Sequence, residues 1–167
     1  MKLFLLCGPI AAGKTTYCLN AARQGILSIN DDAIVNMLHA NDYTLYQKQL
    51  KILYKNIENM IVGNVLSMNR SIIVDRGLNS NLSARKRWIS LANSFDVPVE
   101  AIIFKNEGPE VHATRRWQSD SRGHTYDYWL KVATRHQEMQ SEPTLDEGFD
   151  KVHRISYEEI VSGFVFE

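Results

Sequence analysis

The chain has 167 residues, of which 44% are hydrophobic and 23% charged, the composition of an ordinary globular protein with one sizeable core. Its 19 lysines and arginines equal its 19 aspartates and glutamates, which excludes an overall basic charge for coating nucleic acid. Any contact with nucleic acid would need a local basic patch. The two cysteines, Cys7 and Cys18, exclude a disulfide framework and a CxxC metal pair, so we expect two reduced thiols near the core.

Apolar runs alternate with helical patterns along the chain. The first run, Leu3 to Cys7, ends in a glycine-rich turn and predicts a strand that is buried on both faces. Further strands are expected at 26–29, 71–75, 99–104 and 152–155, and helices at 14–23, 31–39, 43–68, 82–95, 109–119, 125–140 and 157–161. Within 43–68, apolar residues recur at steps of three and four and predict one buried stripe: Tyr46, Leu50, Leu53, Ile57, Ile61 and Val65.

This alternation predicts an α/β fold, a three-layer αβα sandwich around a mostly parallel five-stranded sheet. We expect a single domain over residues 1–167, with a helical, arginine-bearing lid at about residues 115–140. No apolar run approaches the length that spans a bilayer, and the run after Met1-Lys2 is too short for a signal peptide. We therefore expect a cytoplasmic protein with no membrane partner, whose oligomeric state the sequence does not indicate.

Residues 8–15 match the phosphate-binding pattern GxxxxGK[ST] in full, between a predicted strand and a predicted helix. Gly8 and Gly13 let the backbone curl so that its N–H groups face phosphate oxygens. Lys14 is expected to reach the β- and γ-phosphates of ATP, and the Thr15 hydroxyl to bind Mg²⁺. The residues expected to hold the nucleotide are Gly8, Ala11, Ala12, Gly13, Lys14, Thr15 and Thr16.

Other positions separate transfer from hydrolysis. No NKxD tetrapeptide follows the fourth predicted strand, which disfavours a GTPase. The third strand ends in Asp75, and Arg76 stands next, where a hydrolytic ATPase usually has a glutamate that polarises water. The pattern therefore favours transfer of a phosphoryl group to a bound acceptor, with ATP and Mg²⁺ as cofactors.

The acceptor side is expected near Asp31, because the carboxyl ends of neighbouring parallel strands share one crevice. A carboxylate there accepts the proton of the attacking hydroxyl. The alternative for Asp31, and the stronger one for Asp32, is a helix cap without a catalytic role. Asp75 is expected to support Asp31, to hold Mg²⁺ through water or to contact the acceptor, and Arg76 to bind an acceptor phosphate or to form a surface salt bridge.

Arginines in the predicted lid provide cations for the transition state. Arg122 is the main candidate because Gly123 lets it turn inward, and Arg115 and Arg116 are further candidates; a solvated helix face is the alternative for all three. Arg85 belongs to a basic cluster beside Trp88 that would contact a nucleic-acid acceptor. The alternative is that this cluster only covers the core.

Five features over almost the whole chain resemble the kinase domain of phage-type polynucleotide 5′-hydroxyl kinases and related P-loop kinases. The phosphate loop is highly specific for the superfamily, and the other four are informative together. They are the loop Gly8–Thr15, the stretch Asn30-Asp31-Asp32, the strand end Asp75-x-x-Leu78-Asn79, the segment Ser119-x-x-Arg122-Gly123 and the tail Pro143…Glu147-Gly148-Phe149. The resemblance implies that Asp31 is the general base and that Arg122 contacts the ATP phosphates.

Two departures leave the acceptor open. The resembling family tends to have an arginine three residues after the base, where it grips the acceptor's phosphate, and Ile34 stands there instead. The pair Asp75-Arg76 resembles the Asp-Arg pair of thymidylate and deoxynucleoside kinases. The predicted function is ATP-dependent phosphorylation of a polynucleotide 5′-hydroxyl, in the host cytoplasm if a phage encodes the chain. The alternatives are a nucleoside or nucleotide kinase, a kinase of a hydroxymethylated base in DNA, and a nucleotide-binding module without catalysis.

Overall fold

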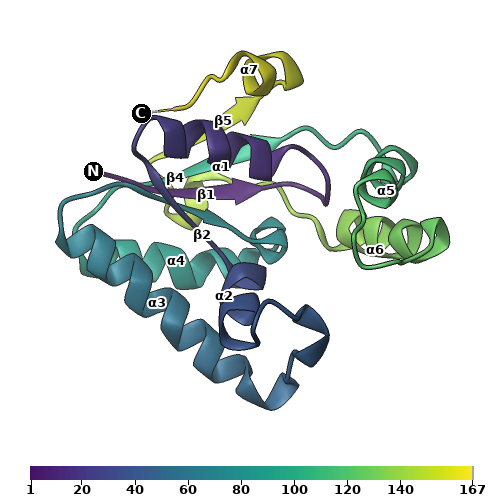
Figure 1. Cartoon of the computed structure of the whole chain (residues 1–167). Coiled ribbons are helices and arrows are strands. Elements are labelled where there is room, and N and C mark those ends of the chain that lie inside the picture. The colour runs from purple at the N-terminus through teal and green to yellow at the C-terminus, as the bar shows by residue number, and fades with distance from the viewer. Residues whose placement is uncertain (167) are drawn as a thin grey trace.

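Five parallel strands form a single sheet at the centre of the molecule (Figure 1). The computed structural model describes residues 1–166, apart from the side chain of Leu78, which belongs to one of the resembling motifs and lies outside this description. The strand order is β2-β3-β1-β4-β5, and every neighbouring pair is parallel. The strands are β1 (Leu3–Cys7), β2 (Leu27–Asn30), β3 (Ile72–Asp75), β4 (Val99–Phe104) and β5 (Lys151–Ile155).

The register brings the ends of β2 and β3 to one edge of the sheet. Asn30 pairs with Asp75, and Leu6 of β1 lies opposite Asp75 on the other side. Because all strands run the same way, the loops that follow β1, β2 and β3 open at this edge. These loops carry the predicted site residues.

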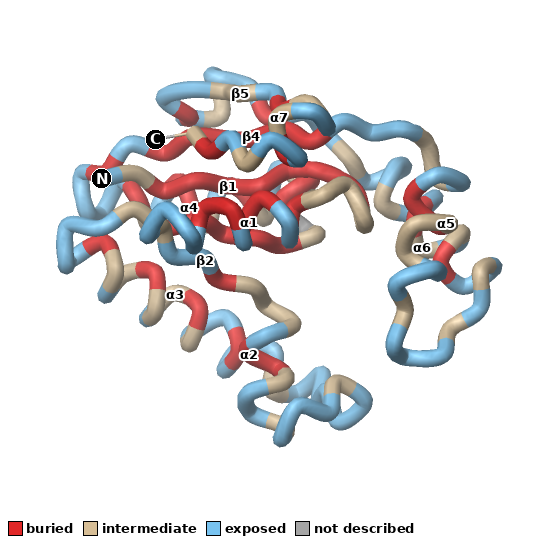
Figure 2. Tube along the Cα trace, turned by 45° about the horizontal axis from the view of Figure 1, so that its top comes forward, coloured by how far each residue is buried: buried red, intermediate tan, exposed pale blue. Residues whose placement is uncertain are grey.

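Helices cover both faces of the sheet, as the α/β prediction requires. On one face lie α1 (Lys14–Arg23) and α7 (Tyr157–Ser162), and on the other α2 (Asp31–Leu38), α3 (Lys51–Ser67) and α4 (Leu82–Ser94) (Figure 1). The two apolar clusters match these two layers, and Figure 2 shows the buried residues concentrated along the strands and the helix sides that face them. The helices α5 (Pro109–Gln118) and α6 (Tyr126–Met139) form a third cluster beyond the strand ends, where Trp129 and Ala113 pack with Ile10 of the phosphate loop.

The predicted fold class is confirmed, and most element boundaries agree within one residue. Short 3-10 turns occur at η3 (Gly77–Ser80) and η4 (Leu145–Glu147). No helix within residues 1–166 has the length and apolar character needed to cross a membrane.

The stretch 43–68 is the exception, because it is not one helix. Two 3-10 turns, η1 (Tyr43–Leu45) and η2 (Lys48–Leu50), precede α3. The Asp42 side chain accepts the N–H of Thr44 and so starts a separate turn, and the hydroxyl of Tyr54 accepts the N–H of Gln47. These side-chain acceptors satisfy backbone groups that a continuous helix would pair internally.

The buried stripe of α3 is confirmed in part. Leu50, Ile57, Ile61 and Val65 pack against the core as predicted, whereas Tyr46 and Leu53 are exposed. The most deeply buried positions are the neighbouring ones, Tyr54, Val62 and Leu66. The stripe includes one carboxylate, Glu58, which is 1% exposed. A buried carboxylate requires charged or hydrogen-bonding partners, and here they are Arg76 and Arg87.

Candidate active site

The phosphate loop connects β1 to α1 and has the backbone conformation that its glycines permit. A Cβ on Gly8 would lie 2.7 Å from the Cβ of Phe104, so only glycine fits there without a shift. Gly13 caps α1 with a φ of +97°, a left-handed conformation that favours glycine. A Cβ at Gly13 would also meet Ile160 of α7 at 3.2 Å. The loop is therefore narrow, and it is packed from behind by β4 and α7.

Lys14 is held inside this loop. Its Nζ donates to the carbonyl oxygens of Gly8 at 3.0 Å and Pro9 at 2.5 Å, and the residue is only 9% exposed. Burial lowers the pKa of Lys14, and the nearby Asp75 carboxylate partly opposes that effect. The ammonium group thus lies in a partly desolvated position, where its attraction to phosphate is stronger than in water.

A cavity of about 800 Å³ opens in front of the loop. Residues from the phosphate loop, the β2 and β3 ends and α5 all line it. Its lining residues are Ile10, Ala11, Gly13, Lys14, Thr15, Thr16, Asn30, Asp31, Asp32, Tyr43, Asp75, Gly77, Arg115, Arg116, Ser119 and His136. The structure therefore brings Lys14, Thr15, Asp31 and Asp75 to one space. Gly8 and Ala12 are not among the lining residues; Gly8 shapes the loop from behind.

Polar contacts from Asn30 at the end of β2 fix the Asp75 carboxylate at the end of β3. The amide nitrogen of Asn30 donates to the Oδ2 of Asp75 at 3.3 Å, while its Oδ1 accepts the N–H of Ala33 and caps α2. Burial raises the pKa of Asp75, which is 5% exposed, and Lys14 is the main opposing influence. Asn30 thus performs two tasks: it caps α2 and it binds the Asp75 carboxylate.

Arg76 contacts Asp31 directly. Its Nε lies 3.0 Å from the Oδ2 of Asp31, and its Nη1 lies 3.4 Å from a carboxylate oxygen of Glu58. Arg87 of α4 forms a second ion pair with Glu58 at 2.8 Å. Arg76 therefore holds Asp31 in place from outside the cavity. The sequence does not identify Glu58 as the partner of these arginines. Its only signal there is that a carboxylate stands within a stripe of apolar residues.

The segment between α5 and α6 contributes cations near the cavity mouth. The Nη2 of Arg122 lies 3.3 Å from the Oδ2 of Asp32, and its guanidinium is 4.3 Å from the ring centre of Tyr43. Gly123 has a φ of +75°, which supplies the turn expected after Arg122. Arg122 is not a lining residue, whereas Arg115 and Arg116 are. Tyr43 is a further cavity residue that the helical interpretation of 43–68 did not single out.

The residues present fit a magnesium nucleotide. The loop leaves no room for a Cβ at Gly8, its lysine is desolvated, and the Thr15 side chain lines the same cavity as the Asp75 carboxylate. Thr15 would hold the ion directly and Asp75 would do so through water. When bound with ATP, magnesium neutralises charge on the β- and γ-phosphates.

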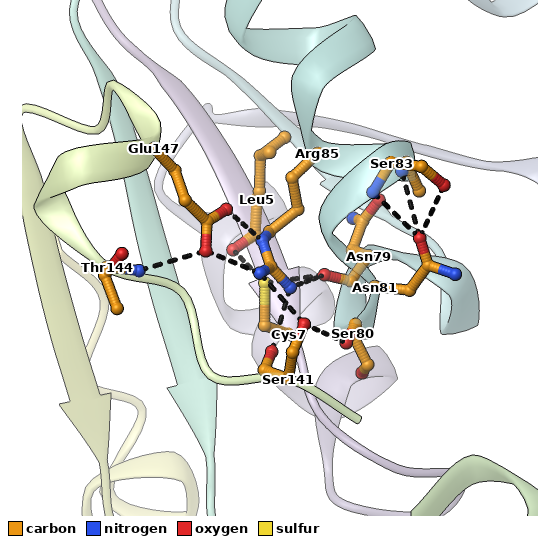
Figure 3. Close-up of polar contacts among 11 residues, drawn as sticks. Leu5, Cys7, Asn79, Ser80, Asn81, Ser83, Arg85, Ser141, Thr144 and Glu147 are labelled. Atoms are coloured by element: carbon orange, nitrogen blue, oxygen red, sulfur yellow. Dashed lines mark hydrogen bonds and ion pairs between the residues drawn. The ribbon is translucent and has the colours of Figure 1, made fainter. Parts of the chain in front are cut away.

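Arg85 requires a correction, because the structure buries it and pairs it within the protein. It is fully buried, and its Nε and Nη2 donate to the two carboxylate oxygens of Glu147 at 2.7 and 2.6 Å (Figure 3). Its Nη1 donates to the carbonyl oxygens of Asn79 and Ser141. All nitrogens of this guanidinium are used inside the protein, so Arg85 joins α4 to the segment before β5 and does not bind substrate.

We expect the substitution Arg85→Met to lower the free energy of unfolding by about 3 kcal/mol, because it leaves the Glu147 carboxylate without its partner in a mostly buried place. Urea unfolding of the purified protein measures this loss. The matched control is Arg154→Met. Arg154 forms an exposed ion pair with Glu142, and such a pair should contribute less than about 1 kcal/mol to the free energy of unfolding. Equal losses in the two variants would contradict the structural role of Arg85.

Comparisons with known proteins agree with this architecture. The chain resembles a candidate kinase from Chloroflexus aurantiacus with a TM-score of 0.69 and 16% identity, over 92% of this chain and 84% of that one. It resembles a shikimate kinase from Bacteroides thetaiotaomicron (TM-score 0.59, 16% identity, 97% and 93% covered) and a gluconokinase from Sinorhizobium meliloti (TM-score 0.56, 14% identity, 97% and 88% covered). At these identities the likeness shows the fold of small P-loop kinases. No curated protein matches the chain.

A family model matches most of the sequence. The model is AAA_33, described as an AAA domain, and it covers residues 3–141. That span runs from β1 to just beyond α6 and includes the phosphate loop, both carboxylate-bearing strand ends and the arginines of the predicted lid. This chain belongs to the AAA_33 family of AAA domains.

Proposed function

We propose that this protein is an ATP-dependent phosphotransferase that moves the γ-phosphoryl group to a hydroxyl of a small acceptor, a nucleoside or a nucleotide in the first instance. One observation carries the proposal: Lys14 of the phosphate loop and the Asp31 carboxylate line the same cavity, with Asp31 fixed from behind by Arg76. A nucleotide-binding module would need the loop but would not need a positioned carboxylate opposite to it.

The proposed step uses these groups in one displacement. The acceptor oxygen forms a bond to the γ-phosphorus, and the bond from that phosphorus to the β,γ-bridging oxygen breaks with its electron pair leaving on ADP. Asp31 accepts the hydroxyl proton and later releases it to water. Lys14 stabilises the charge that develops on the phosphate oxygens. Arg76 keeps the Asp31 carboxylate in position during the transfer.

The small acceptor is supported by two observations. The solved structures with this fold include a shikimate kinase and a gluconokinase, both named for small hydroxylated acceptors. In addition, the basic cluster that was a candidate for holding nucleic acid loses one of its members, because Arg85 is fully buried and paired with Glu147. Both observations favour the nucleoside or nucleotide alternative over a polynucleotide.

A polynucleotide 5′-hydroxyl is the second candidate acceptor. The segment Ser119-x-x-Arg122-Gly123, one of the features that resemble the polynucleotide kinases, supports it: Gly123 has a φ of +75°, and Arg122 lies 3.3 Å from Asp32 at the cavity. In contrast, Ile34 is 4% exposed and packs in the core, so the acceptor-phosphate arginine of the resembling family has no counterpart at this position.

An acceptor screen tests the proposal. The wild-type protein is incubated with magnesium and γ-labelled ATP, in parallel with shikimate, gluconate, nucleosides, nucleoside monophosphates, 5′-hydroxyl oligonucleotides and hydroxymethylated duplex DNA. We expect label on a nucleoside or a nucleoside monophosphate. Label on oligonucleotides alone would favour the second candidate, and label on no acceptor would contradict the kinase proposal.

The substitution Arg122→Ala is expected to lower kcat by about 10²-fold, the typical effect of removing one donor that stabilises transition-state charge. The ATP dissociation constant should change by less than about tenfold, because the phosphate loop supplies most of the ground-state contacts. Steady-state kinetics and calorimetric titration of ATP measure the two effects separately.

The control for this variant is Arg23→Ala, which removes an exposed arginine from the last turn of α1, away from the cavity. Its kcat should equal that of the wild type. If Arg122→Ala also turned over at the wild-type rate, Arg122 would be a solvated side chain, and the cavity arginines Arg115 and Arg116 would be the remaining lid cations.

A further inference from the structure

A second, smaller cavity lies outside the site described above, where the first turns of α3 and α4 meet. Its volume is about 230 Å³. Cationic and hydroxyl-bearing side chains dominate its lining, which comprises Lys51, Lys55, Arg76, Asn81, Ser83, Ala84 and Arg87. The two helices lie on the same face of the sheet (Figure 1), and Arg87 of α4 donates to the carbonyl oxygen of Lys55 in α3.

The charges around this cavity do not balance. Four cations line it, and the carboxylates bound to them are Glu58, shared by Arg76 and Arg87, and Asp31, bound by Arg76. Lys51 and Lys55 are exposed and form no ion pair with any of residues 1–166. Two positive charges are therefore left without an acidic partner beside one small cavity.

The two lysines also stand where a cation is unfavourable. Lys51 is the first residue of α3 and Lys55 follows four residues later, so like charges face each other next to the positive end of the helix dipole. In the described chain, acidic residues occupy the first turns of α2, α5, α6 and α7, and none occurs in the first turns of α1, α3 and α4. The start of α1 is the phosphate loop. The starts of α3 and α4 converge on the second cavity, and a bound anion would offset the unfavourable placement of the two lysines at the start of α3.

The second cavity is joined to the proposed reaction site by one side chain. Arg76 lines it and is 8% exposed, while its Nε holds the Asp31 carboxylate. Nε of Arg76 pairs with Asp31 and Nη1 with Glu58, whereas Nη2 has no partner among the described residues, so its N–H groups remain for a ligand. An anion in this cavity is therefore separated from the proposed general base by a single guanidinium group.

We infer that this cavity binds a phosphate group carried by the acceptor, so that the acceptor is a phosphorylated molecule such as a nucleotide and not an unphosphorylated nucleoside or sugar. This inference rests on the proposed kinase function and names its substrate class. A phosphate dianion matches two unpaired lysines in charge, and its oxygens accept from ammonium and guanidinium donors at once. The first N–H groups of α4 do not take part in this site, because the Asn81 side chain already accepts the N–H groups of Ser83 and Ala84.

A binding experiment tests the cavity independently of catalysis. Inorganic phosphate is titrated by calorimetry into protein saturated with magnesium and the β,γ-imido analogue of ATP, so that the phosphate loop is filled. We expect the double variant Lys51→Ala/Lys55→Ala to bind phosphate about tenfold more weakly than the wild type, or worse. The matched control is Lys86→Ala/Lys151→Ala, which removes two exposed lysines outside both cavities and should keep the wild-type affinity.

A kinetic experiment then tests the link to the acceptor. The ratio of kcat/KM for a nucleoside monophosphate to that for the matching nucleoside should exceed about tenfold in the wild type and fall toward one in Lys51→Ala/Lys55→Ala. Equal phosphate affinity in the wild type and this variant would overturn the inference, and so would phosphate binding without a preference for the phosphorylated acceptor. If no acceptor is labelled at all, the proposed function fails, while the titration still decides whether the cavity binds phosphate.

Discussion

Replacing Lys14 by alanine should reduce phosphoryl transfer by roughly 10³-fold or more and also weaken ATP binding. Among the described residues, Lys14 is the only lysine that lines the cavity of about 800 Å³. The Gly8 and Pro9 carbonyl oxygens hold its side chain inside the loop. Its loss removes a desolvated cation from the β- and γ-phosphates, where charge develops in the transition state. Transfer of γ-label at saturating acceptor and calorimetric titration of ATP give the two effects.

The same substitution should leave the fold intact. Burial lowers the pKa of Lys14, which means that the charged form is held at a cost in the folded protein, so its removal is not expected to lower the unfolding temperature. Thermal unfolding of the variant therefore separates a catalytic loss from misfolding. Lys131→Ala, an exposed lysine of α6, is the control and should transfer at the wild-type rate. Near-normal transfer in Lys14→Ala would contradict the assignment of the phosphate loop.

Replacing Asp31 by asparagine should lower kcat by about 10³-fold, within the range that general bases contribute, with little change in ATP affinity. Asparagine has nearly the same shape as aspartate but cannot accept the hydroxyl proton. Arg76 would lose one carboxylate and keep Glu58, so the network behind the site should stay folded. Single-turnover transfer measures the chemical step, and ATP titration reports on binding.

Asp32→Asn is the sharpest comparison for this prediction, because Asp32 lines the same cavity one residue later and is bound to Arg122 instead of Arg76. We expect it to lower kcat by less than about tenfold, since its carboxylate does not act as the base. If the two variants were equally impaired, the base would not be assigned to Asp31. If Asp31→Asn transferred at the wild-type rate, Asp31 would be a first-turn carboxylate of α2 without a catalytic role.

Local pattern was enough to predict the fold. Buried parallel strands are continuous apolar runs, and here each ends at a turn residue, so their ends could be placed within one residue. The phosphate loop could be predicted for the same reason. Its motif occupies eight consecutive residues, and the strand before it and the helix after it are both visible in the sequence. The helices that follow good caps, such as α2 after Asn30, were equally predictable.

The parts that escaped prediction depend on contacts between distant segments. The sequence could not show that Tyr54 takes up the N–H of Gln47 and so stops a continuous helix, or that Glu58 meets Arg76 across 18 positions. Arg85 illustrates the same limit, because its partner Glu147 is 62 residues away and turns an apparent surface arginine into a buried structural one. In each case the neighbouring sequence suggests that a polar side chain faces solvent, whereas in the fold it bonds to a residue of another segment.

The contact between Gly13 and Ile160 links the nucleotide loop to a part of the chain that the family match does not cover. Ile160 lies beyond residue 141, its carbonyl oxygen accepts the Asn20 amide of α1, and its side chain occupies the space next to the Gly13 Cα. Relatives that share the motif can therefore differ in this supporting wall. The space beside Gly13 is thus set by a side chain of α7, so a substitution at position 160 changes the packing of the phosphate loop while every residue of the motif stays the same.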